Sequence, residues 1–208
     1  MKRKICPSCD KAIKACICQS IKKIDSDIQI IILQHPSEVK NAIGTARILN
    51  LSLPNCHIIV GENFTENDEL NRYLNDPDRN CYLLYPSEDS VNIAEFELTT
   101  TQHQNTYILL DGTWRKAFKM YQSSTNLHDL QAIRYDSSLV SNYTIRSTSV
   151  AGGLSTVEAG HLLLSTLDNN KQKYQPLLDS FEYMINFQIA AMPEGVFKKH
   201  YLQSNKDN

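Results

Sequence analysis

The apolar residues of this chain fall into short aliphatic runs separated by segments with helical spacing. The strongest run is Ile28–Leu33, whose continuous IQIIIL sequence is typical of a strand buried on both faces. Shorter runs of the same kind predict four further strands, at His57–Val60, Cys81–Tyr85, Thr106–Leu110 and Gln131–Tyr135.

Between these runs, apolar residues recur at intervals of three and four, which predicts helices. The predicted helices are Val39–Leu51, Glu66–Leu74, a segment from Trp114 to about Tyr121, Thr156–Leu167 and Leu177–Ala190. Strands that alternate with helices predict an α/β fold, with a mostly parallel sheet and helices on both faces. We expect one domain over residues 25–208, preceded by a small segment of different composition at residues 1–24.

The composition is that of a globular protein. Hydrophobic residues make up 41% of the chain, and seven glycines and seven prolines are too few for a disordered or fibrous protein. No apolar run reaches the roughly 18 residues of a membrane span. The start, MKRKICPSCDK, lacks the apolar stretch of a secretory signal. We therefore expect a cytoplasmic protein with no membrane partner.

The charge is distributed unevenly. The net charge of −2 does not indicate nucleic-acid binding, but Met1–Ile24 holds seven basic residues and one acidic residue. A local basic patch of this kind can bind a polyanion such as RNA. A solvated basic tail explains the same pattern, and charge alone does not decide between the two.

Four of the six cysteines lie close together, at Cys6, Cys9, Cys16 and Cys18. Disulfides are disfavoured in a cytosolic protein, whereas four thiolates at this spacing suit tetrahedral Zn²⁺. The segment is too short to build a core, so metal binding would supply its folding energy. Free thiols remain the alternative, and a redox role is disfavoured because no βαβ pattern surrounds the Cys-x-x-Cys pair.

Polar clusters follow three of the predicted strands. These are His35-Pro36-Ser37-Glu38, Tyr85-Pro86-Ser87-Glu88 and Asp111-Gly112-Thr113-Trp114. Serine caps and first-turn glutamates also mark ordinary helix starts, and we expect a helix after each cluster. Because parallel α/β sheets bind ligands beyond the carboxyl ends of their strands, the three clusters predict a site for an anionic or nucleoside ligand.

A later segment, Ala151–Ala159, offers further site residues. Gly152 and Gly153 would let the backbone approach a ligand, and Ser155-Thr156 before Glu158 can cap the next helix. The chain has no G-x-G-x-x-G, no phosphate-binding G-x-x-x-x-G-K-[ST] and no G-x-S-x-G elbow. These absences count against dinucleotide-binding, kinase-like and hydrolase readings.

Taken together, the motifs resemble those of the DTW-domain family. Asp111-Gly112-Thr113-Trp114 resembles the D-x-T-W motif that names the family, and Ser155–Ala159 resembles its S-T-x-E-A motif. The two other strand-end clusters and the zinc-knuckle-like start resemble family features in the same order along the chain. One departure is visible, since Arg146-Ser147-Thr148 lacks the proline of the family's R-x-P segment.

The resemblance implies a fold and an activity. Family members are tRNA-uridine aminocarboxypropyltransferases whose fold is similar to SPOUT enzymes, which implies a topological knot near the C-terminal part of the sheet. They transfer the 3-amino-3-carboxypropyl group of S-adenosyl-L-methionine to N3 of a tRNA uridine and release methylthioadenosine. The resemblance thus implies S-adenosyl-L-methionine as co-substrate, structural Zn²⁺, tRNA as partner and no DNA.

It also implies roles for individual residues. Asp111 would take the N3 proton or hold the donor's ammonium, and Trp114 would stack on adenosine or the target base, or pack beneath the site. The expected catalytic residues are Asp111, Thr113 and Trp114. The expected donor-binding residues are Tyr85, Pro86, Ser87, Glu88, Asp111, Arg146, Leu154, Ser155, Thr156 and Glu158. The expected RNA-binding residues are His35, Glu38, Arg115, Lys116 and Lys119.

Three other functions remain open. An RNA methyltransferase would use the same donor but transfer its methyl group. A zinc-containing RNA-binding protein would have the same basic start and no chemistry. A nucleotide-binding hydrolase or kinase-like enzyme would need a phosphate loop that this chain lacks.

Overall fold

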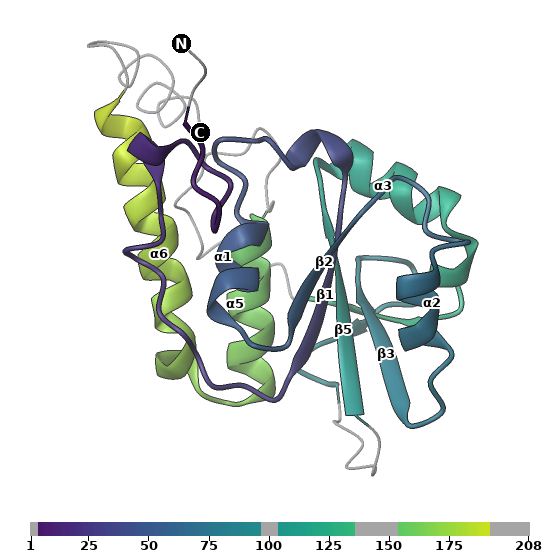
Figure 1. The fold of residues 1–208 in the computed structure, drawn as a ribbon. Coiled ribbons are helices and arrows are strands. Elements are labelled where there is room, and N and C mark those ends of the chain that lie inside the picture. Colours follow the sequence, from purple (N-terminus) through teal and green to yellow (C-terminus); the bar gives the residue numbers. More distant parts are fainter. Residues whose placement is uncertain (1–3, 97–103, 136–153, 192–208) are drawn as a thin grey trace, which may run out of the picture.

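The computed structural model describes residues 4–96, 104–135 and 154–191. Within them, six strands form one all-parallel sheet in the order β2-β1-β5-β3-β6-β4 (Figure 1). The strands are β1 (Gln29–Gln34), β2 (Cys56–Val60), β3 (Arg79–Leu84), β4 (Val91–Asn92), β5 (Gln104–Asp111) and β6 (Gln131–Arg134). The helices are α1 (Ala46–Ser52), α2 (Asp68–Leu74), α3 (Trp114–Ser123), α5 (Thr156–Leu167) and α6 (Lys171–Ala190), with short 3₁₀ turns η1 (Ile13–Ala15), η2 (Pro36–Glu38) and η3 (Thr125–Leu127).

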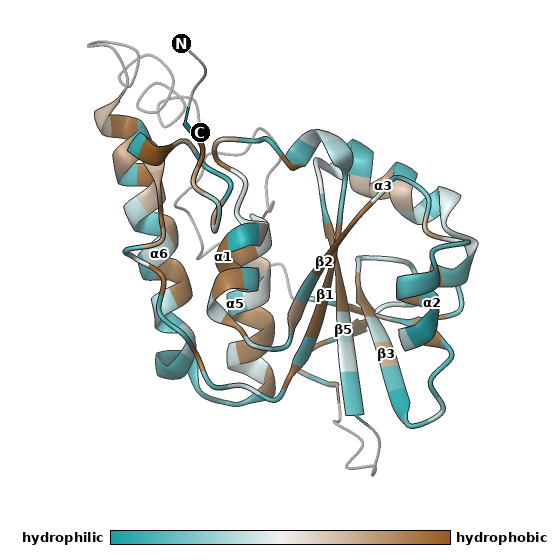
Figure 2. Cartoon of the chain, in the orientation of Figure 1, coloured by the Kyte–Doolittle hydropathy of each residue, from teal (hydrophilic) through white to brown (hydrophobic). Residues whose placement is uncertain are grey.

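Helices cover both faces of the sheet, as the sequence predicts. Side chains of a strand alternate between faces, so Ile30 and Ile32 of β1 pack on the side of α1, α5 and α6. Ile31 and Leu33 pack on the side of α2 and α3. All four are fully buried, which explains why β1 is a continuous apolar run (Figure 2).

The amino-terminal segment packs against this body. Cys6, Cys9 and Ile17 belong to the same apolar core as α1, α5 and α6. The ammonium of Lys11 is buried, and its Nζ donates hydrogen bonds to the carbonyls of Ala42 at 2.8 Å and Gly44 at 3.1 Å. The segment is therefore fixed to the loop before α1, although a domain boundary after residue 24 stays a prediction.

Two helices differ from the predicted bounds by more than two residues. The predicted helix Val39–Leu51 begins only at Ala46, because Asn41 and Gly44 close turns in the preceding loop, where the Gly44 N–H donates to the Asn41 carbonyl at 3.0 Å. The last helix begins at Lys171 rather than Leu177 and runs through Pro176. Asn170 caps it by accepting from the Lys173 N–H at 3.0 Å. The cap and the packing of the helix thus outweigh the tendency of Pro176 to interrupt a helix.

The Pro-Ser-Glu cluster after β3 does not start a helix, and that expectation is wrong. Ser90 donates through its N–H and its hydroxyl to the Ser87 carbonyl, at 3.2 and 2.6 Å, which closes a turn. The chain then enters β4, a strand of two residues that is too short to show a pattern. The implied knot stays a prediction, because residues 136–153 and 192–208 lie outside the described part of the chain. None of the described helices has the length and apolarity needed to cross a membrane.

Candidate active site at the carboxyl ends of the strands

The last residues of β1 and β5 form a polar pair in the sheet. Gln34 lies beside Asp111 in the parallel register, and alternation along both strands turns the two side chains toward α5. Gln34 Nε2 donates a hydrogen bond to Asp111 Oδ2 at 2.7 Å. The Asp111 carboxylate is therefore anchored from within the sheet, and only 6% of the residue is exposed.

The start of α5 meets this pair from the other side. Thr156, the first residue of α5, donates a hydrogen bond through Oγ1 to Asp111 Oδ1. The next residue, Val157, donates its N–H to Thr45 Oγ1 at 3.3 Å, which ties α5 to the loop before α1. Both carboxylate oxygens of Asp111 thus accept hydrogen bonds, and the two motifs named in the sequence meet directly.

Ser155 and Glu158 form a capping box on the same helix. The Ser155 N–H donates to Glu158 Oε2 at 2.8 Å, while the Ser155 hydroxyl bonds both to this carboxylate and to the Glu158 N–H. Glu158 is 1% exposed, and its second oxygen, Oε1, has no hydrogen-bond partner within the described residues. A buried carboxylate oxygen without a donor is costly, so Oε1 is suited to accept from a ligand.

The turn from β5 into α3 follows Asp111 directly and contributes the next residues of the site. Thr113 is the residue before the helix and Trp114 is its first residue; both are exposed. Gly112 fits because a Cβ there would lie 3.1 Å from the Cβ of Lys116 and 3.7 Å from that of His35. This close approach brings the ends of β1 and β5 together with the start of α3.

Ion pairs join η2 and the loop after β2 to α3. Lys116 Nζ lies 2.6 Å from Glu38 Oε1, and Lys119 Nζ lies 2.8 Å from Glu62 Oε2. His35 Nε2 lies 3.4 Å from Glu62 Oε1, while its Nδ1 accepts from the Ser37 N–H at 3.2 Å.

These pairs affect both the carboxylates and the expected RNA contacts. Burial raises the pKa of the Glu38 carboxyl, but the hydrogen bonds from Lys116 and Asn41 outweigh it, so the net pKa lies below the ordinary value. Lys116 and Lys119, which the resemblance assigns to RNA, both have carboxylate partners. Arg115 has none in the described part of the chain.

The cluster after β3 lies beside β5 but faces α3. The Tyr85 ring stacks on Tyr121 with centroids 4.5 Å apart, and Ser87 belongs to the turn before β4. Among the described residues, no hydrogen bond joins Tyr85, Pro86, Ser87 or Glu88 to Asp111. Leu154 is half-buried just before α5. Arg146 and the Gly152-Gly153 pair lie outside the described residues.

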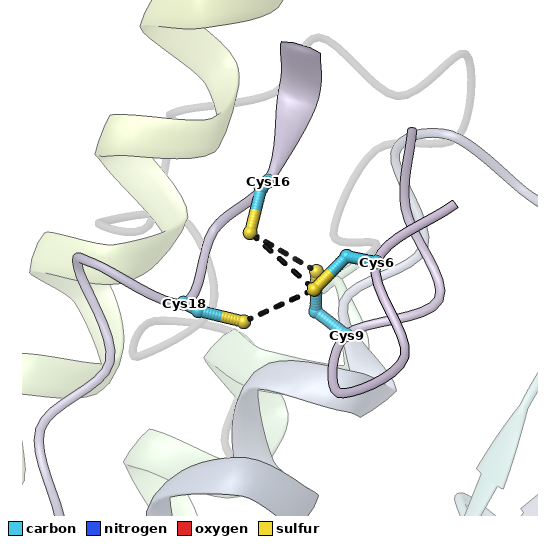
Figure 3. Close-up of side chains that lie close together, drawn as sticks. All are labelled: Cys6, Cys9, Cys16 and Cys18. Atoms are coloured by element: carbon cyan, nitrogen blue, oxygen red, sulfur yellow. Dashed lines mark hydrogen bonds between the residues drawn. The ribbon is translucent and has the colours of Figure 1, made fainter. Parts of the chain in front are cut away.

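The four amino-terminal cysteines converge on one point (Figure 3). Their sulfur atoms lie within 4.8 Å of one another, with Cys6–Cys18 and Cys6–Cys16 at 3.6 Å and Cys9–Cys16 at 3.7 Å. Four thiolates bound to Zn²⁺ at about 2.3 Å would be about 3.8 Å apart, so the cluster fits tetrahedral zinc.

The acid–base properties of these thiols agree with a metal site. Backbone N–H groups of Cys9 and Ser8 lower the pKa of Cys6 to about 6, which favours its thiolate. Burial, with smaller contributions from the neighbouring thiols, raises the pKa of Cys18 to about 12. A divalent cation would stabilise all four thiolates together.

Two hollows of the described surface lie away from Asp111. One of about 210 Å³ lies at the amino end of β5, between Asn105, Tyr107 and Asp168. Another of about 320 Å³ is lined by residues of β2, α2 and β3 that include His57 and Arg79. Neither hollow borders Asp111, and the candidate site is identified by its hydrogen-bonded side chains.

Sequence reasoning missed several residues of this site. Gln34 and Thr45 hold Asp111 and α5, and Glu62 pairs with Lys119 and His35. A polar residue that ends an otherwise apolar strand was a usable signal for Gln34. Thr45 and Glu62 carry no such signal, because their roles depend on the tertiary arrangement.

Comparisons with known proteins agree with the motifs. A family model described as the DTW domain matches residues 3–189. A Drosophila melanogaster protein named tRNA-uridine aminocarboxypropyltransferase 2 is 32% identical, over 99% of this chain and 83% of its own. A Mus musculus protein of the same name is 27% identical over 98% and 70%, and an Arabidopsis thaliana protein named tRNA-uridine aminocarboxypropyltransferase A is 26% identical over 90% and 81%. No solved structure matches the chain.

Proposed function

The chain belongs to the DTW-domain family, and we propose that it is a tRNA-uridine aminocarboxypropyltransferase that uses S-adenosyl-L-methionine. The names and nearly full-length match of its relatives support the reaction. The observation that carries the site assignment is the hydrogen bond from Thr156 to Asp111, because it joins the D-x-T-W turn to the S-T-x-E-A helix start.

The proposed reaction is a substitution at carbon. When bound, the donor supplies a carbon activated by its sulfonium. Uridine N3 forms a bond to that carbon of the 3-amino-3-carboxypropyl group as the carbon–sulfur bond breaks. The bonding electrons stay on sulfur, which gives neutral methylthioadenosine, and the N3 proton passes to a base. Orientation is the main task of the protein, because it decides which carbon of the sulfonium meets the nucleophile.

The carboxylates of Asp111 and Glu158 have different roles in the proposed reaction. Asp111, held by Gln34 and Thr156, takes the N3 proton through a remaining lone pair. Glu158 Oε1 is the buried acceptor without a partner in the described chain, and it accepts from the ammonium of the transferred group. The orphaned oxygen is the feature of this structure that fits the donor.

The cysteine cluster would hold Zn²⁺ in a structural role. The four sulfurs would bind the ion, and the amino-terminal segment would thereby be held against α1 and α6. The exposed basic residues of that segment, with Arg115, contact tRNA phosphates. The target uridine is exposed or flipped out of its stack to reach Asp111.

The released nucleoside distinguishes this function from methyl transfer. The purified protein is incubated with tRNA and S-adenosyl-L-methionine, and the small products are separated by chromatography. We expect methylthioadenosine that depends on tRNA and is lost in Asp111→Asn, while Asp179→Asn, at an exposed carboxylate of α6, leaves it unchanged. S-Adenosylhomocysteine would establish the methyltransferase instead, and neither product would favour a binding protein without chemistry.

A further inference from the structure

Helix α3 has a second apolar side that faces solvent. Ala117 and Met120 are buried against the sheet, but Trp114 is 47% exposed and Phe118 is 56% exposed. Residues three or four apart are neighbours on the surface of a helix, so Phe118 lies next to Trp114, four residues before it, and next to Arg115, three residues before it. We call the surface formed by Trp114, Arg115 and Phe118 the α3 ledge.

The two aromatic rings of the α3 ledge make no ring contact with the rest of the described fold. Tyr121, on the same helix, is paired with the rings of Tyr85 and His128. Neither Trp114 nor Phe118 stacks on another ring among the described residues. Adjacent exposed aromatic side chains beside a polar site are a feature of interaction surfaces rather than of a solvated helix.

The charges around the ledge leave one cation available. Lys116 and Lys119, on the same helix, are neutralised by Glu38 and Glu62. Arg115 is exposed and pairs with no carboxylate in the described ranges. Two open ring faces beside a free guanidinium match unpaired nucleotides, whose bases stack on aromatic rings and whose phosphates bind arginine.

The ledge begins at the rim of the site. Trp114 follows Asp111 by three residues, and Figure 1 shows α3 starting where β5 ends, beside η2. The Cα–Cβ bonds of a helix tilt toward its amino end, so both rings lean toward the strand ends. A nucleotide next to the target uridine would therefore meet Trp114 first and Phe118 second.

We propose that the α3 ledge binds the unpaired nucleotides that flank the target uridine, stacking their bases on Trp114 and Phe118 with a phosphate at Arg115. The inference rests on the proposed function in that it takes RNA as the substrate. It adds that the substrate is recognised as a single strand. A duplex hides its base faces and would not fit the ledge.

The fluorescence of Trp114 tests the proposal without an activity assay, because it is the only tryptophan of the chain. The full-length protein is titrated with oligouridine and, separately, with duplex RNA of the same length. We expect saturable quenching by oligouridine at concentrations where the duplex gives none. Equal quenching by both RNAs, or none by either, would overturn the proposal.

Substitutions distinguish the contribution of the Phe118 ring to oligouridine binding from that of the Arg115 charge. Phe118→Ala should weaken oligouridine binding by about 5- to 150-fold, the loss of one base stack, whereas Phe118→Tyr should bind as the wild type does. Arg115→Gln should reduce the slope of log affinity against log salt by about 0.7, and Phe118→Ala should leave that slope unchanged. Val60→Ala, at an exposed residue on the edge strand β2, is the control.

The outcomes distinguish this proposal from the proposed function. If methylthioadenosine forms but Phe118→Ala keeps its affinity for oligouridine and its KM for tRNA, the proposed role of the α3 ledge is refuted and the proposed transferase function is retained. If Phe118→Ala weakens oligouridine binding but the protein transfers no group to tRNA, the RNA-binding role of the α3 ledge is retained and the proposed transferase function is refuted. If Trp114 emission shifts to the blue with protein concentration alone and the chain sediments as a dimer, a second copy covers the ledge and the proposal is overturned.

Discussion

Thr156 donates a hydrogen bond to Asp111, joining the first residue of α5 to the last residue of β5 across 45 positions of sequence. The contact brings the two most specific motifs of the chain to one carboxylate. Gln34 holds the other oxygen of that carboxylate from the neighbouring strand. The candidate site is therefore a junction of sheet and helix, and its parts are testable one at a time.

The hydroxyl group of Thr156 should contribute more to kcat and to stability than the volume of its side chain does. Thr156→Val keeps the shape but removes the donor, so we expect kcat to fall by about 100-fold as Asp111 loses its position. The free energy of unfolding should fall by about 1–3 kcal/mol, because a buried carboxylate oxygen is left unpaired. Thr156→Ser keeps the donor and should remain close to the wild type in both measurements. Equal losses in the two variants would show that the hydrogen bond is not the cause.

The cysteine cluster should bind one zinc ion per chain and stabilise the fold. Removal of the metal with a chelator should lower the melting temperature, because the thiolates that bind it belong to the same core as α6. Cys16→Ser should lose the metal, measured by elemental analysis. Cys81→Ser, at a cysteine on β3 outside the cluster, should keep it. A metal-free protein with an unchanged melting temperature would show that the thiols are free.

Lys11 should stabilise the loop before α1. Lys11→Met removes the buried donor of the Ala42 and Gly44 carbonyls, and we expect the free energy of unfolding to fall by about 2 kcal/mol. Hydrogen exchange should become faster in that loop and at the start of α5, which Thr45 holds. Lys14→Met, at an exposed lysine of the same segment, is the matched control. Unchanged exchange at α5 in Lys11→Met would refute the link.

Acid should destabilise the fold through His161. Burial, with a smaller contribution from Lys171, lowers the pKa of this imidazole from the ordinary 6.5 to about 4. Between these values the unfolded chain binds a proton that the folded chain does not. Stability is therefore complete above about pH 6.5 and falls as the pH drops toward 4, by roughly 2–4 kcal/mol.

Chemical denaturation across this pH range measures the effect of His161. His161→Gln should flatten the slope, whatever its stability at neutral pH. Ser165→Ala keeps the imidazole and removes only the hydroxyl that lies 3.4 Å from its Nε2, so it should retain the slope. A His161→Gln variant with the slope of the wild type would place the acid sensitivity elsewhere.

Much of the fold could be predicted from the sequence because its sheet is parallel. A strand buried on both faces is apolar along its centre, as in residues 30–33 of β1, and the amphipathic helices between strands are long enough to recognise. The start of α1 was misplaced because turns closed by Asn41 and Gly44 precede it, and the apolar spacing does not reveal them. The Pro-Ser-Glu sequence after β3 suits either a helix or a turn, and only the pairing of β4 with β6 selects the turn.

The same limit applies to the site. Asp111 and Thr156 were predictable from their motifs, but their direct contact was not, because it depends on how α5 crosses the end of β5. The exposure of Trp114 and Phe118 was also hidden in the sequence, since an aromatic pair at helical spacing usually belongs to a core. The pairing of Lys116 with Glu38 depends on a contact between segments 78 residues apart.

The most direct test of the account is mass analysis of nucleosides from tRNA that has been incubated with the protein and S-adenosyl-L-methionine. We expect a uridine that carries the added mass of the aminocarboxypropyl group with the wild-type protein and not with Asp111→Asn. A uridine that carries only a methyl group, or an Asp111→Asn protein as active as the wild type, would contradict it.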